Sequence, residues 1–108
     1  MTAYEKHLRM IADIINEFDF EKVHKAMKCL GWTWFGVGCP TIDQLRNSAR
    51  QRLDSAIKGC LADGKPDIEY IVSSGGMKAT AYKNDYGQIT FIQLEFILTS
   101  WESDEDYL

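Results

Sequence analysis

Apolar side chains recur at helical spacing near the start of the chain, and polar residues fill the positions between them. This pattern predicts an amphipathic helix over roughly residues 3–17. Asp19 is a typical cap for a second helix, and Gly31 is a typical stop. The apolar positions are Tyr4, Leu8, Ile11, Ile15 and Phe18 in the first helix and Phe20, Val23, Met27 and Leu30 in the second.

A third and longer helical period begins after Pro40. Thr41 and Gln44 have the spacing of a capping box, which predicts that the helix starts there. Gly64 and Pro66 end it. Its apolar positions are Ile42, Leu45, Ala49, Leu53, Ala56, Ile57, Cys60 and Leu61.

The last third of the chain changes to a period of two. Residues 68–72 form a short β-type run, which the small residues 73–76 interrupt. A second run alternates over 77–82, and residues 84–87 have good turn chemistry. The third run, 88–101, is long for one strand and predicts a bulge or an early helical ending.

The order of these elements predicts an α+β fold, with three helices packed on one face of a small, mainly antiparallel three-stranded sheet. We expect one domain over residues 1–101, followed by an acidic tail over 102–108. The exposed edges of such a sheet and the modest core of a 108-residue chain favour self-association into a homo-oligomer.

Charge is unevenly distributed in a chain with 12 basic and 16 acidic residues and a formal net charge of −4. Residues 46–83 are locally basic, whereas the chain from Glu95 onward carries acidic residues and no basic one. A uniform basic face for duplex nucleic acid is therefore not expected, because neutralising phosphates needs many clustered cations. The local excess of positive charge in residues 46–83 still allows an anion-binding pocket in that segment.

Histidine and cysteine spacing gives no catalytic or metal-binding pattern. His24 and Cys29 are five positions apart on the second helix, on different faces. The three cysteines lack a C-x-x-C spacing, which predicts reduced thiols and no zinc site. We therefore predict no catalytic residues, no metal and no cofactor.

Two further absences bear on location. No apolar run approaches the roughly 18 residues of a membrane span, and the N-terminus lacks the pattern of a signal peptide. We therefore expect no membrane association and a cytoplasmic location.

Part of the chain resembles small accessory proteins encoded by bacteriophages and prophages. The resemblance covers roughly residues 18 to 101 in one order. It rests on the segments FDFEKVHKAMKCLGWTW (18–34), PTIDQL (40–45) and GGMKA (75–79) and on the strand that ends at Trp101. It implies an origin in a phage or mobile element, and hence a location in the cytoplasm of an infected or lysogenic bacterium. Phage proteins of this size often block host defence, but the resemblance supplies no site residues.

Ser74, Gly75, Gly76 and Lys78 form one candidate anion site. Glycines let successive backbone N–H groups approach an anion, and a nearby lysine adds charge. The spacing is not that of a P-loop, and a Gly-Gly pair between strands is also typical of a turn or bulge.

Arg46 and Arg50 form a second candidate, one helical turn apart. Their forked guanidinium groups suit phosphate or carboxylate. The alternative is a solvated helix face that Asp43 and Asp54 stabilise. Anion binding is favoured over a solvated face only if Arg46 and Arg50 lie next to the Gly-Gly segment.

A protein partner would be reached by other residues. Aromatic side chains next to glycines are available for contact, and an acidic tail can mimic nucleic-acid phosphate in a basic groove. These candidates are Trp34, Phe35, Glu102, Asp104, Glu105 and Asp106.

These features favour a non-catalytic accessory protein of phage type that binds and inhibits or sequesters a host component. The partner is either a host protein or a small phosphorylated ligand that resembles a nucleotide. The alternatives are a nucleic-acid-binding module and a small enzyme of unrecognised type.

Overall fold

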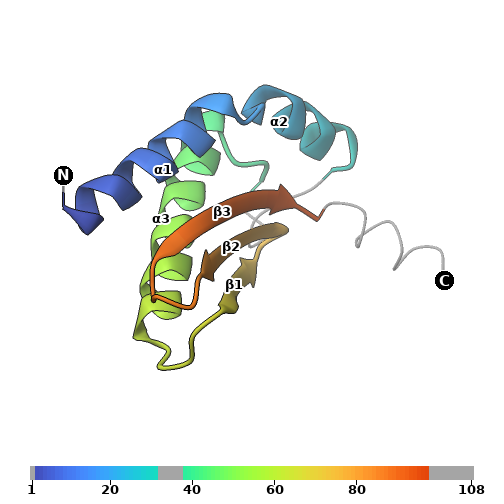
Figure 1. Ribbon diagram of the computed structural model, residues 1–108. Coiled ribbons are helices and arrows are strands. Elements are labelled where there is room, and N and C mark those ends of the chain that lie inside the picture. Colours follow the sequence, from blue (N-terminus) through green and yellow to red (C-terminus); the bar gives the residue numbers. More distant parts are fainter. Residues whose placement is uncertain (1, 32–37, 98–108) are drawn as a thin grey trace, which may run out of the picture.

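The computed structural model describes residues 2–31 and 38–97 of the chain. Within these ranges the chain forms three helices followed by three strands (Figure 1). The order confirms the predicted α+β fold. The elements are α1 (Ala3–Glu17), α2 (Phe20–Cys29), α3 (Ile42–Ala62), β1 (Ile68–Ser74), β2 (Met77–Lys83) and β3 (Ile89–Phe96).

Side-chain caps set the starts of α1 and α2. Thr2 Oγ1 accepts a hydrogen bond from the backbone N–H of Glu5 at 3.1 Å, and Asp19 Oδ1 accepts one from the N–H of Lys22 at 3.0 Å. Each bond satisfies a backbone donor that has no partner within the helix. Phe18 lies between the two helices in an extended conformation, so α2 leaves at an angle to α1.

The α3 helix is fixed at both ends by side chains. The backbone N–H of Gln44 donates to Thr41 Oγ1 at 3.1 Å, and Gln44 Oε1 accepts from the N–H of Thr41 at 2.9 Å, which confirms the predicted capping box. At the other end, Nζ of Lys83 in β2 donates to the carbonyl of Asp63, the residue after the helix. Lys83 is 5% exposed, so its ammonium group lies buried at the negative end of the helix dipole.

The described strands form an antiparallel sheet in the order β1-β2-β3. Gly75 and Gly76 connect β1 to β2 with φ values of +61° and +80°, as a two-residue hairpin turn of the mirror-image type requires. The sequence placed a break at Ser73. In the structure β1 continues through Ser74, because the two glycines make the turn by themselves.

The predicted third strand is shorter in the structure. β3 ends at Phe96, and the predicted run beyond Ile97 lies outside the described residues. The bulge predicted for this run is present: Tyr82 pairs with Phe91 and Lys83 with Ile89, so Thr90 is the extra residue in β3.

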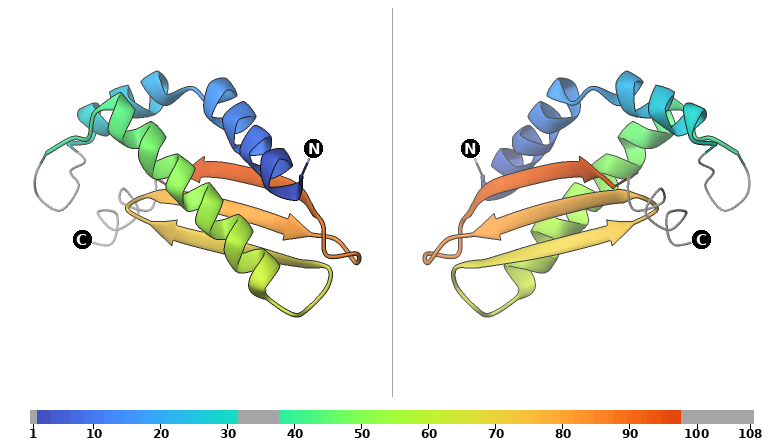
Figure 2. Two further views of the ribbon diagram at one scale, coloured as in Figure 1. Left: turned by 90° about the vertical axis from the view of Figure 1, so that its left-hand side faces the viewer. Right: turned by 90° about the vertical axis from the view of Figure 1, so that its right-hand side faces the viewer.

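The helices lie on one side of the sheet, and α3 crosses it diagonally (Figure 2). Small residues permit this close approach: Ala79 and Ala81 in the central strand are fully buried. Gly59 in α3 lies against the ring of Tyr70 in β1, and a Cβ at position 59 would overlap that ring. In the described ranges, no helix covers the opposite face of the sheet, on which Ile71 and Phe91 are exposed.

The other helices complete the layer around α3. α1 packs against α3 and β3, and α2 packs against α3. The ring of Phe20 in α2 lies 4.9 Å from the Phe18 ring and 6.3 Å from the Phe96 ring of β3, measured between centroids. This aromatic cluster closes the core at the end of the sheet where α1 meets α2.

Candidate functional site

The Gly-Gly segment is a hairpin turn whose neighbours are already engaged. The backbone N–H of Ile97 donates to the carbonyl of Gly76 at 2.7 Å. The hydroxyl oxygen of Ser74 accepts from Nε and Nη2 of Arg52 at 3.2 and 2.8 Å. The geometry of this turn is therefore explained by the fold, and Ser74 serves to hold the turn against α3.

The arginine beside the hairpin is Arg52, which the sequence analysis did not single out. Its Nη1 also donates to the carbonyl of Ser48 at 3.4 Å, one turn earlier in α3. Partial burial lowers the pKa of Arg52, but the guanidinium stays charged because its ordinary pKa is so high. The one sequence signal for this role is that Arg52 stands two positions after Arg50, and therefore on another side of the helix.

Lys78 lies on the opposite face of the sheet from Ser74. Lys78 pairs directly with Ser73 on β1 and with Glu95 on β3, and side chains of directly paired residues share a face. Ser74 pairs with Met77, whose side chain is buried beneath the helices. Of the four residues predicted as one anion cradle, Ser74 and Lys78 therefore direct their side chains to opposite faces of the sheet.

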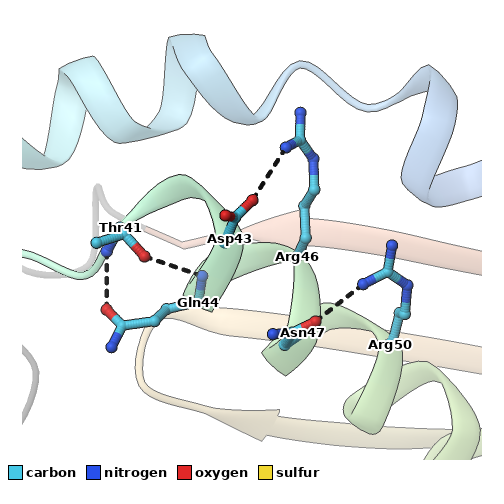
Figure 3. A network of polar contacts seen from close by, with 6 residues as sticks. All are labelled: Thr41, Asp43, Gln44, Arg46, Asn47 and Arg50. Atoms are coloured by element: carbon cyan, nitrogen blue, oxygen red, sulfur yellow. Dashed lines mark hydrogen bonds and ion pairs between the residues drawn. The ribbon is translucent and has the colours of Figure 1, made fainter.

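Arg46 and Arg50 lie together on a different surface, at a solvent-open hollow between α1 and α3 with a volume of about 450 Å³. We call it the arginine hollow; Figure 3 shows both guanidinium groups extending from α3 toward the segment that carries α1 and α2. Arg46 and Arg50 do not lie beside the Gly-Gly turn, so the two candidate anion sites do not combine into one site. The hollow is lined by Ile15, Asn16, Asp43, Arg46, Asn47 and Arg50.

The polar contacts within the arginine hollow are few and local. Arg50 Nη1 donates to Asn47 Oδ1 at 2.9 Å, and Arg46 Nη1 lies 3.5 Å from Asp43 Oδ1. Asp54 does not take part as predicted: its Oδ2 pairs with Nζ of Lys58 at 2.8 Å. The prediction that both acids stabilise this helix face therefore holds for Asp43 and is wrong for Asp54, which lies one turn farther along α3 and pairs with Lys58.

A second hollow, of about 510 Å³, adjoins the first and shares Asp43 and Arg46 with it. α2 contributes His24 and Lys28 to its lining, and Cys39, from the segment before α3, also lines it. The guanidinium carbon of Arg46 lies 5.8 Å from the centre of the Phe20 ring, close enough for a cation–π contact. Arg46 is thus positioned between the two hollows by an aromatic ring and a carboxylate.

Together the hollows gather positive charge on a chain that is acidic overall. Lys28, Arg46 and Arg50 line them, against the carboxylates of Glu21 and Asp43. Arginine and asparagine side chains offer several N–H donors at fixed angles, which suits the oxygens of a phosphate. Asn16 of α1 is the lining residue that sequence reasoning missed, since nothing in its local pattern relates it to α3.

Other reactive groups lie apart from these hollows. Cys60 is fully buried in α3, its Sγ lies 3.8 Å from the carbonyl oxygen of Ile68, and burial raises the pKa of its thiol. Burial, assisted by the charge of Lys6, lowers the pKa of His7 near the start of α1. Across residues 2–31 and 38–97, no group of three or more histidine, cysteine, aspartate or glutamate residues is placed to hold a metal ion.

The predicted partner-binding residues lie outside the part of the chain that the structure describes. They are Trp34, Phe35, Glu102, Asp104, Glu105 and Asp106. The expected boundary between the domain and its acidic tail, at residues 101 and 102, also falls there.

None of the described helices is both long enough and apolar enough to cross a membrane. Comparisons of the chain with protein-family models, with curated proteins and with solved structures give no match.

Proposed function

We propose that this protein is a non-catalytic binding protein that holds a small phosphorylated, nucleotide-like ligand in the arginine hollow. In the phage setting that the sequence resemblance implies, it would sequester this ligand from a host component such as a defence system. The observation that carries the proposal is the placement of Arg46, Asn47 and Arg50 on one wall of a hollow, with Asn16 on another element across it.

The number of donors left for a ligand supports this choice. Each guanidinium has five N–H groups, and the contacts given above engage one nitrogen of Arg46 and one of Arg50. Arg52, by contrast, directs three nitrogens at Ser74 and Ser48. An anion would therefore find more unused donors at the arginine hollow than beside the hairpin.

The size of the two adjoining hollows suits a small molecule better than a polymer. Each lies within the range of about 300–1,000 Å³ that is usual for small-ligand pockets. A nucleic-acid duplex would need a longer track of cations. The acidic balance of the whole chain, −4, works against that track.

The proposal is tested by native mass spectrometry with linear and cyclic nucleotides, followed by calorimetric titration of any nucleotide that binds. We expect a stoichiometric mass shift, competition by inorganic phosphate and weaker binding at high salt. Arg46→Ala and Arg50→Ala should each weaken binding by about tenfold or more, because each removes a charge-assisted hydrogen bond.

Arg52→Ala is the matched control, because it removes the same side chain from the same helix on the side of the hairpin. Binding that survives Arg52→Ala and Lys78→Ala but not Arg50→Ala places the ligand in the arginine hollow. Loss with Lys78→Ala alone would place it on the sheet and overturn the proposal. Absence of binding by every nucleotide would also overturn it, in favour of a host protein captured from a lysate or of nucleic acid seen in a gel shift.

A further inference from the structure

Among the described strands, β3 lies at an edge of the sheet, and its side away from β2 lies next to α1. It pairs with β2 on one side, and in Figure 2 α1 runs along its other side on the helical face of the sheet. Between the end of α1 and β3 there is a hollow of about 330 Å³. We call it the edge hollow; its apolar lining includes Ile14, Phe18 and Leu94.

The backbone of β3 presents hydrogen-bonding groups along this edge. The N–H of Ile97 donates to the carbonyl of Gly76, and this bond shows which residues of β3 are bonded to β2. Along an antiparallel strand, the backbone N–H and C=O groups of successive residues point alternately to the two edges. The odd-numbered residues 91–97 bond to β2. The N–H and C=O groups of Ile92 and Leu94 therefore point toward the free edge.

From Phe91 onward this edge lacks the common features that prevent strand addition. Natural edge strands are often protected by lysine, proline or bulges. β3 carries no lysine or proline, its one charged residue is Glu95, and its bulge, at Thr90, lies before the stretch 91–96. Phe91 is 49% exposed on the strand and also lines the edge hollow.

We propose that a second copy of this chain adds its own β3 to this edge, antiparallel, to make a continuous sheet across a two-fold axis. The axis passes close to Gln93, near the middle of the eight-residue strand, where the overlap of the two strands is greatest. Ile92 then exchanges backbone hydrogen bonds with Leu94 of the partner subunit.

The side chains complement one another in this arrangement. Side chains that a fourth strand directs toward the helices lie on the same face of the sheet as the edge hollow. In a second copy these are Ile92 and Leu94 of the partner subunit, which stay buried in their own core and border the apolar hollow without filling it. Across the sheet, Glu95 lies opposite Phe91 of the partner subunit, so the acidic residues do not face each other.

The other edge of the sheet is less suited to this pairing. Because Ser74 and Met77 flank a two-residue turn, Glu69, Ile71 and Ser73 direct their backbone groups to the free edge of β1. A two-fold axis at its central residue, Ile71, would pair the two exposed Ile71 side chains but place the polar Ser73 opposite the acidic Glu69 of the partner subunit on each side of them. Neither hollow beside α1 lies along this edge.

The test is the mass of the full chain in solution, measured by sedimentation equilibrium over a range of concentrations. We expect a dimer for the native chain and for Ile71→Lys, the matched substitution at the corresponding axis position on the edge of β1. Gln93→Lys should shift the chain to monomer, with a dissociation constant at least about tenfold higher, because like charges then face each other across the axis. Gln93→Glu should do the same.

Mixing the Gln93→Lys and Gln93→Glu chains should restore a dimer that contains one of each, which a misfolded variant could not form. A monomeric native chain overturns the proposal. So does a dimer that Gln93→Lys leaves intact, and a dimer that Ile71→Lys dissociates would move the interface to β1. None of these results depends on whether the arginine hollow binds a nucleotide.

Discussion

The two sides of α3 show how one helix can use similar residues for different purposes. The side toward the sheet carries small and apolar residues, and its arginine, Arg52, holds the hairpin through Ser74. The side toward α1 and α2 carries Arg46 and Arg50, whose contacts stay within the helix. We infer that the first side serves mainly stability, while the second leaves charge available for a ligand.

The largest effect that tests this contrast is expected at Leu53, which is fully buried in α3. Leu53→Ala should lower the free energy of unfolding by about 2–5 kcal/mol, because it leaves a cavity in the core. Urea unfolding measures the change. Gln51→Ala, at an exposed position two residues away, is the control and should stay within about 0.5 kcal/mol of the native value.

Gly59 offers a test of the close approach between α3 and β1. Gly59→Ala should destabilise the protein by about 1–3 kcal/mol, because its Cβ would overlap the Tyr70 ring. In a Tyr70→Ala background the same change should instead stabilise the helix by up to about 1 kcal/mol. If Gly59→Ala destabilised both backgrounds equally, the ring contact would not be the reason for the glycine.

The link between Arg52 and Ser74 should contribute about 0.5–1 kcal/mol, as expected for a solvent-accessible hydrogen bond to a charged group. A double-mutant cycle with Arg52→Ala and Ser74→Ala measures it. The coupling free energy should be of that size, and additive effects would mean that Arg52 holds the hairpin by packing alone.

The smallest effects on stability are expected at the arginine hollow. Arg50→Ala should change the free energy of unfolding by less than about 0.5 kcal/mol, because its contact with Asn47 is exposed and local. Arg46→Ala should cost slightly more, up to about 1 kcal/mol, since it also removes the contact with Phe20. A larger loss of stability in Arg50→Ala would mean that the side of α3 toward α1 and α2 serves stability, as the side toward the sheet does.

The sequence by itself determined the local elements of this protein. The caps at Thr2, Asp19 and Thr41 and the Gly-Gly pair act over two to four residues, and helical or alternating periods identify which face of each element is buried. The helix starts, the strand order along the chain and the α+β class could therefore be predicted.

The tertiary structure decided how those elements combine into candidate sites. Arg50 and Arg52 point about 160° apart around α3, but the rotation of the helix on the sheet decides that Arg52 meets Ser74. The pleat of the sheet likewise separates Lys78 from Ser74, although both belong to one short segment. Asn16 joins the arginine hollow because α1 packs on α3, a contact between residues far apart in the sequence that no local pattern encodes.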